Sequence, residues 1–203
     1  MPDQVRHDRI QNSEAVDMSH PHAPDHVKLI SSLFSPEKEA IDRVIEQLSE
    51  IYGPVDWISH ELFFDRTKYY AREMGWPLHR RFISFSELVP VDSLVDMKLK
   101  TNQVEQQYLL NGNRRVNIDP GCISPERLIL ATGKNYIHRV YLSRGIYADL
   151  TLIFQRGSYR PLEWTFRDYA DPETIGFFNE IRKQYMSQLK EKRSAISSQH
   201  SAS

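Results

Sequence analysis

The chain has 203 residues, 40% hydrophobic and 26% charged, which excludes a disordered or fibrous protein and gives one domain enough residues to bury a core. Its 26 Lys and Arg nearly balance 27 Asp and Glu, and the formal charge of -1 argues against a partner drawn by a strong field, such as nucleic acid or an anionic membrane. A single cysteine, Cys122, excludes an intrachain disulfide and a four-cysteine zinc site.

Both ends of the chain are polar and aperiodic. We expect residues 1–25 and 191–203 to be unstructured tails on a single domain that spans residues 26–190. The N-terminus lacks the apolar run of a signal peptide, and no stretch reaches the roughly 18 to 20 apolar residues that cross a bilayer. Together with the lone cysteine, these features predict a cytoplasmic protein without a membrane partner.

The first predicted elements are a strand over residues 27–34 and a helix. Ser35 is a suitable N-cap for that helix, and Pro36 suits its first position, where no N–H is needed. Gly53-Pro54 predicts the end of the helix, because glycine accepts a left-handed conformation and proline cannot continue the helix. Between these limits, apolar residues recur every three or four positions and form one stripe: Ile41, Val44, Ile45, Leu48, Ile51 and Tyr52.

The later elements follow from the same signals of periodicity and turn residues. The sequence predicts strands near residues 55–65, 80–85, 114–119, 127–132, 137–142 and 146–154, with an ambiguous stretch over 67–75. It predicts a helix over 92–110, and Asp171-Pro172-Glu173 begins a last helix with the apolar stripe Phe178, Ile181, Tyr185 and Leu189. The first six elements follow the order β-α-β-β-α-β. We therefore predict an α+β fold with a split βαβ, or ferredoxin-like, core, extended by further antiparallel strands and a C-terminal helix.

Several blocks of the sequence resemble one known family over residues 27–190. They include Thr67-Lys68-Tyr69-Tyr70, Arg114 to Gly121, and His138-Arg139-Val140-Tyr141-Leu142. The family is a prokaryotic domain of unknown function whose members are often labelled "GTP-binding protein". The resemblance implies no established activity. One segment departs from the family pattern: Trp164-Thr165-Phe166-Arg167-Asp168-Tyr169 stands where the pattern reads more like Trp-Thr-Tyr-Pro-Asp-Tyr.

The motifs of a GTPase are missing. A P-loop requires G-x-x-x-x-G-K-[ST], and the nearest match, Ala131-Thr132-Gly133-Lys134-Asn135, lacks the first glycine and the hydroxyl residue. No G-x-G-x-x-G occurs, which argues against a Rossmann dinucleotide site. The sequence therefore excludes a P-loop mechanism and leaves any cofactor unknown.

Two predicted elements carry rows of polar side chains. Alternation along the strand over 114–119 places Arg115, Asn117 and Asp119 on one face, where a cation, an amide and a carboxylate could bind an anionic group. On the helix over 92–110, Lys98, Thr101, Asn102 and Glu105 project from one side. For each row the alternative is a solvent-exposed face with ordinary ion pairs.

A third group lies on the predicted strand over 137–142. His138 is expected on the same side as Val140 and Leu142, where it could act as a base or be a hydrogen-bonded core histidine. If a hairpin forms across Ser143-Arg144-Gly145, Asp149 would approach Arg139 or Tyr141. No zinc-ligand spacing occurs, and the histidines at 20, 22 and 26 lie in a predicted tail, so we expect no metal site.

These rows suggest three functions. The leading hypothesis is the binding of a phosphorylated or otherwise anionic small molecule, with or without catalysis, and the alternative is a non-catalytic protein-interaction module. RNA binding ranks third, since Arg81-Phe82-Ile83-Ser84-Phe85 resembles only part of an RNA-recognition motif. The sequence does not fix the oligomeric state. The candidate ligand-binding residues are Arg81, Lys98, Thr101, Asn102, Glu105, Arg115, Asn117, Asp119, His138 and Arg139.

Overall fold

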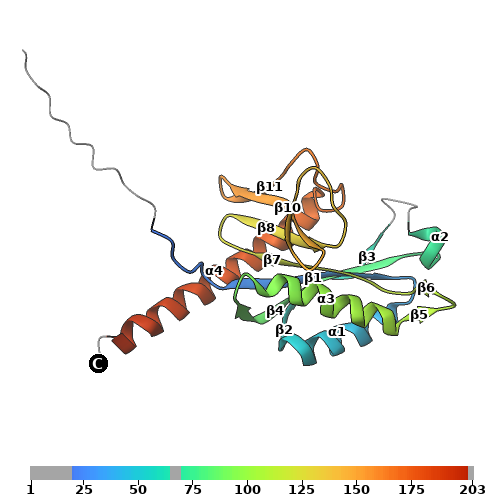
Figure 1. Cartoon of the computed structure of the whole chain (residues 1–203), viewed down its shortest axis with the longest axis horizontal. Helices are drawn as coiled ribbons and strands as arrows, with labels where there is room; N and C mark the ends of the chain where they lie inside the picture. The colour runs from blue at the N-terminus through green and yellow to red at the C-terminus, as the bar shows by residue number, and fades with distance from the viewer. Residues whose placement is uncertain (1–19, 65–69, 201–203) are drawn as a thin grey trace, which may run out of the picture.

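A computed structural model describes residues 20–64 and 70–200 and shows an α+β fold with one large antiparallel sheet (Figure 1). Within those residues, nine strands form the sheet, in the order β11-β10-β8-β7-β1-β4-β2, with β3 also on β4 and β9 also on β10. The strands are β1 (Val27–Ser35), β2 (Val55–Ile58), β3 (Leu62–Phe63), β4 (His79–Val89), β7 (Asn117–Ile123), β8 (Arg127–Thr132), β9 (Arg139–Ser143), β10 (Ile146–Gln155) and β11 (Ser158–Pro161).

Helices cover both faces of the sheet. The described helices are α1 (Lys38–Tyr52), α2 (Ala71–Met74), α3 (Ser93–Gln107) and α4 (Pro172–His200), and a small hairpin of β5 (Leu109–Leu110) and β6 (Asn113–Arg114) follows α3. Figure 1 shows α1 and α3 together on one side of the sheet and α4 crossing behind it. The prediction of an α+β fold with added antiparallel strands and a C-terminal helix is confirmed.

Two buried clusters hold these layers together. Residues of α1 and α3 pack on one face of β1, β4 and β7, around Leu33, Val44 and Ile118. On the opposite face, the stripe of α4 packs against Phe82 and Ile30. All four predicted stripe residues of α4 are buried: Phe178, Ile181, Tyr185 and Leu189.

Strand β1 is the centre of the fold. All nine of its residues are buried, and it is paired on one side with β4 and on the other with β7. Helix α4 also contacts its beginning: the Tyr185 hydroxyl donates to the His26 carbonyl at 2.8 Å, and the Lys28 ammonium donates to Gln188 Oε1 at 2.9 Å. The start of the domain is thus enclosed by elements that come much later in the chain.

The predicted strand over 114–119 is wrong in its limits. The chain turns through Asn111 and Gly112, both with positive φ, and forms the β5–β6 hairpin, which ends at Arg114. Strand β7 then begins at Asn117 and continues through Pro120 to Ile123. A proline is tolerated there because β8 pairs with β7 only from Gly121 onward, so the outer edge of β7 at Pro120 needs no N–H.

Helix limits also differ from the predictions. Ser35 belongs to β1, and α1 begins at Lys38; the Ser35 hydroxyl instead accepts the Glu37 N–H at 3.0 Å. At the other end, α4 continues through residues 191–200, which we expected to be unstructured. Glu191, Lys192 and Arg193 favour helix, and Arg193 forms an ion pair with Asp25. Residues 20–25 are exposed and without regular structure, while 1–19, 65–69 and 201–203 lie outside the described residues.

Gly121 marks the point where β8 joins the sheet. A Cβ atom at this position would lie 2.5 Å from the Ile129 carbonyl oxygen and 2.8 Å from Leu130 Cδ2. Ordinary side chains do not approach a backbone oxygen so closely. Only glycine therefore permits β7 and β8 to pair here as they do.

Candidate functional site

One group of candidate residues meets at the start of β7. The Asn117 side chain lies between Arg114 and Asp119: its Oδ1 accepts from Arg114 Nη1 at 3.0 Å, and its Nδ2 donates to Asp119 Oδ2 at 2.8 Å. Arg114 also forms two hydrogen bonds with Glu73 of α2, at 2.7 and 2.8 Å, and its Nη1 lies 3.8 Å from Glu105 Oε2. We call these five residues the β7 polar cluster.

The cation of this cluster is Arg114, and the prediction of Arg115 there is wrong. Alternation fails because the chain bends at Arg115 between the end of β6 and the start of β7. Arg115 points elsewhere: it donates to Glu37 Oε1 at 2.7 Å and to the Met74 carbonyl at 3.0 Å. Asn117 and Asp119 do lie together, as alternation predicted.

The polar row on α3 faces the protein interior rather than solvent. Lys98, Thr101 and Glu105 are all buried, whereas Asn102 is only partly buried. The Lys98 ammonium donates to the Ile118 carbonyl at 3.0 Å, and Glu105 Oε1 accepts the Ile118 N–H at 2.6 Å. Because β8 does not reach this part of β7, the two side chains satisfy backbone groups that a neighbouring strand would otherwise bond. This geometry gives Lys98 and Glu105 a structural role.

Of the basic doublet Arg80-Arg81, the residue in a buried ion pair is Arg80, whereas the candidate ligand-binding residue was Arg81. Arg80 is 3% exposed and bonds Asp168 and the Ser32 hydroxyl, the latter at 2.8 Å. Its guanidinium carbon lies between 4.5 and 5.9 Å from the ring centres of Phe34, Phe64, Phe82 and Tyr169. Arg81 points to the other face and is half-buried, without an ion pair to any described residue. Arg80 and Phe82 are two residues apart on β4, so their side chains point to the same face of the sheet. This spacing was the sequence signal that could have predicted the burial of Arg80.

His138 lies in a turn before β9 and not on the strand, so the prediction that it shares a strand face with Val140 and Leu142 is wrong. Its ring stacks on Trp164, with centroids 5.2 Å apart, and its Nε2 lies 3.5 Å from Asp149 Oδ2. The expected β9–β10 hairpin forms, and Arg139 Nε donates to Asp149 Oδ2 at 2.8 Å. The same Arg139 donates to the Lys134 carbonyl at 2.9 Å, which ties the β8–β9 loop to β9.

One comparison with known proteins supports the resemblance to a family of unknown function. A family model described as "Domain of unknown function (DUF4416)" matches residues 25–185. The chain belongs to this family. A search of curated proteins and a search of solved structures each found no match.

The segment from Trp164 to Tyr169, which departs from the family pattern at two positions, makes several internal contacts. The Trp164 indole N–H donates to the Leu150 carbonyl at 2.8 Å, and Thr165 Oγ1 donates to the Thr151 carbonyl at 2.6 Å. Asp168 pairs with Arg80, and Tyr169 is buried. These four residues agree with the family pattern, whereas Phe166 and Arg167, which depart from it, are exposed. The two positions that depart from the pattern therefore lie at the surface of this segment.

Burial and charge move the pKa values of two carboxyls in the β7 polar cluster in opposite directions. Burial raises the pKa of Glu105 above its ordinary value of 4.5, although Lys98 and the Ile118 N–H partly oppose this. The hydrogen bonds from Arg114 lower the pKa of Glu73. Ionised Glu73 therefore stabilises the fold, whereas ionisation of Glu105 is less favourable in the folded protein than in the unfolded chain.

This difference predicts opposite pH dependences for two matched variants. Glu73→Gln should be less stable than the parent at about pH 7, with the gap closing as pH falls below 4.5 through the lowered pKa of Glu73. Glu105→Gln should gain stability relative to the parent as pH rises above 4.5 through the raised pKa of Glu105. Urea unfolding from about pH 3 to about pH 7 measures both curves. Curves that slope in the same direction would contradict the assignment.

Large apolar side chains are exposed around β9. They belong to the end of the β8–β9 loop and to β9 itself, and their exposed fractions are 64% for Tyr136, 95% for Ile137, 67% for Val140, 57% for Tyr141 and 40% for Leu142. We call these five side chains the β9 surface. The Tyr136 and Trp164 rings both contact the His138 ring, so Trp164, which is 39% exposed, borders this surface. Their pattern does not point to a surface site, because an apolar run on a strand normally indicates burial.

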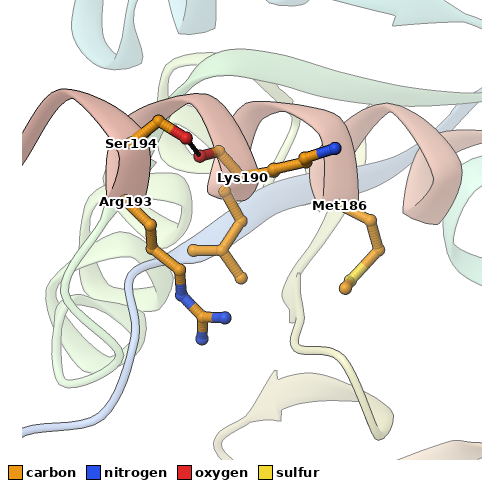
Figure 2. Close-up of a pocket in the computed structure, with 5 residues that line it drawn as sticks. Met186, Lys190, Arg193 and Ser194 are labelled. Carbon is orange, nitrogen blue, oxygen red and sulfur yellow. Dashed lines mark hydrogen bonds between the residues drawn. The ribbon is translucent and has the colours of Figure 1, made fainter. Parts of the chain in front are cut away.

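The hollows along α4 contain none of the candidate residues. One is lined by Met186, Leu189, Lys190, Arg193 and Ser194, and Figure 2 shows Met186 and Arg193 projecting to the same side of the helix. Beside it, another is lined by residues that include Phe154, Arg182 and Lys183.

Among the described residues, no three His, Cys, Asp or Glu side chains are placed to hold a metal ion. No helix in the described part of the chain is long and apolar enough to cross a membrane.

Proposed function

We propose that this protein is an interaction module that binds a protein partner through the β9 surface. The observation that carries the proposal is the run of five exposed apolar and aromatic side chains from Tyr136 to Leu142. Large apolar side chains that gather at the surface are characteristic of interaction sites, and Tyr is enriched in protein interfaces. The position on a strand adds exposed backbone hydrogen-bonding groups to the apolar side chains.

The alternative of an anionic small-molecule site has weaker support. Most cations in the candidate set already have a polar partner: Arg115 pairs with Glu37, Arg139 pairs with Asp149, and Lys98 bonds the Ile118 carbonyl. In the β7 polar cluster, Arg114 lies beside Glu73 and Glu105. A phosphate there would have to displace these carboxylates, and it would meet Asp119 as well. RNA binding is also less well supported, because Phe82 and Phe85 are buried and cannot stack on bases.

For the fold, we infer a ferredoxin-like core made of β1, α1, β2, β4, α3 and β7. The spatial order β7-β1-β4-β2 and the position of α1 and α3 on one face support this inference. We assign no GTP-binding role to the chain. The residues nearest to a P-loop, Gly133 and Lys134, are followed by β9 rather than by the helix that such a loop requires.

Site-specific photo-crosslinking in living cells tests the interaction. A benzophenone amino acid in place of Tyr141 should give a discrete crosslinked adduct, because this position lies in the centre of the β9 surface. The matched control carries the same group in place of Leu110, which is 55% exposed but lies on the separate β5–β6 hairpin. Absence of an adduct at Tyr141, or the same adduct at both positions, would contradict the proposal.

A further inference from the structure

We infer that the partner at the β9 surface is a second copy of this chain, paired β9 to β9 in an antiparallel, two-fold arrangement centred on Tyr141. The inference rests on the proposed function and specifies its partner. It extends the sheet of one copy directly into the sheet of the other.

The outer edge of β9 is open and unprotected. Among the described residues, β9 pairs with β10 alone, so its other edge presents unpaired backbone N–H and C=O groups. Exposed edges are usually protected by lysine, proline or a free charge, and β9 contains no lysine or proline. Its one charged residue, Arg139, is held by Asp149 of the same copy. An edge of this kind is suited to strand addition.

The sequence of β9 is compatible with itself in antiparallel register. With Tyr141 opposite Tyr141 of the second copy, Val140 lies opposite Leu142, and Arg139 lies opposite Ser143. No like charges face each other, and apolar residues face apolar residues. On one face, the Tyr141 ring already contacts Tyr147, at 5.3 Å between centroids, so the two copies would form a row of four tyrosines. The other face would carry Val140 and Leu142 from both copies.

The exposed apolar area around β9 is smaller than a standard interface, so backbone pairing must supply part of the stability of the dimer. Five side chains of roughly 150–200 Å² each, at the exposed fractions given above, present on the order of 500 Å². Stable dimers bury about 800 Å² per partner. The exposed part of Trp164 adds to this area, and the hydrogen bonds between the two β9 edges add stability that the area does not count. The pairing also closes after two copies, because each β9 edge is used once.

A charge-pairing experiment tests both the dimer and its register. Analytical ultracentrifugation of the purified full chain should show a dimer. The variant Val140→Lys/Leu142→Lys places like charges opposite each other across the two-fold axis and should weaken dimerisation at least about tenfold. The variant Val140→Lys/Leu142→Glu places opposite charges there and should retain the dimer. All these positions are exposed in one copy, so circular dichroism should be unchanged, and Leu110→Lys is the control that should stay dimeric.

Three outcomes would overturn the inference. The parent could sediment as a monomer, the two double variants could be equally monomeric, or the Leu110→Lys control could lose the dimer. The crosslinking experiment at Tyr141 separates this from the proposed function. A monomeric parent with an adduct to a different protein overturns the self-pairing alone, whereas a monomeric parent without any adduct overturns both.

Discussion

Asp168→Asn should lower the free energy of unfolding by about 3–5 kcal/mol, because it removes the counter-charge that is bonded directly to a buried guanidinium. Arg80 is 3% exposed, and besides its bonds to Asp168 and Ser32 it lies among aromatic rings, with Asp119 as a more distant negative charge. An asparagine keeps the size of the side chain and removes its charge. The measured loss would therefore report the missing charge and not a cavity. Urea unfolding followed by tryptophan fluorescence gives the value.

The control for this variant is Asp96→Asn. Asp96 also pairs with an arginine, Arg144, at 2.5 Å, but both side chains are more than half exposed. Solvent screens such a pair, so its removal should change stability very little. If the two variants lost similar stability, the contribution assigned to the buried position of Arg80 would be wrong.

Gly121→Ala should destabilise the protein by about 1–3 kcal/mol, through strain between β7 and β8. The added methyl group would lie 2.5 Å from the Ile129 carbonyl oxygen, and a backbone oxygen cannot move aside without displacing its strand. The midpoint of urea unfolding should therefore fall. Backbone amides near Leu130 should also exchange with solvent faster, since the β7–β8 pairing begins there.

Gly133→Ala provides the matched comparison. Gly133 lies in the β8–β9 loop, and a Cβ atom there would meet no atom within 4 Å. Its backbone is also outside the positive-φ region, so alanine is expected to be neutral or slightly stabilising. A loss of stability at Gly133 as large as that at Gly121 would show that steric contact is not the cause.

The sequence predicted elements that depend on local periodicity and turn chemistry. The stripe from Phe178 to Leu189 is buried, and the hairpin across Arg144 and Gly145 brings Asp149 to Arg139, as expected. Both features depend on the spacing of residues within one or two neighbouring elements. Such spacing can be read directly from the order of the residues. Positions set by pairing between distant strands were harder to predict.

Three residues show where local pattern did not predict the environment of a side chain. Arg115 was expected beside Asn117. The β5–β6 hairpin and the bend at Arg115 interrupt the alternation of side chains along the strand, so Arg114 contacts Asn117 instead. Glu105 was expected on an open ridge, but it bonds the Ile118 N–H because β8 joins β7 only at Gly121. Val140 is apolar yet exposed, because β9 is at the edge of the sheet. Each outcome depends on strand order and on where pairing starts, which local pattern does not encode.

The central position of β1 has a consequence for how the protein is made. This strand is synthesised early and is buried along its whole length, but its partners β4 and β7 follow it by tens of residues, and α4 follows much later. During translation, β1 is therefore synthesised before the strands and the helix that bury it. The native core cannot form until α4 has left the ribosome. The core of this domain is therefore completed late, and until then the nascent chain exposes the kind of extended apolar strand that chaperones shield.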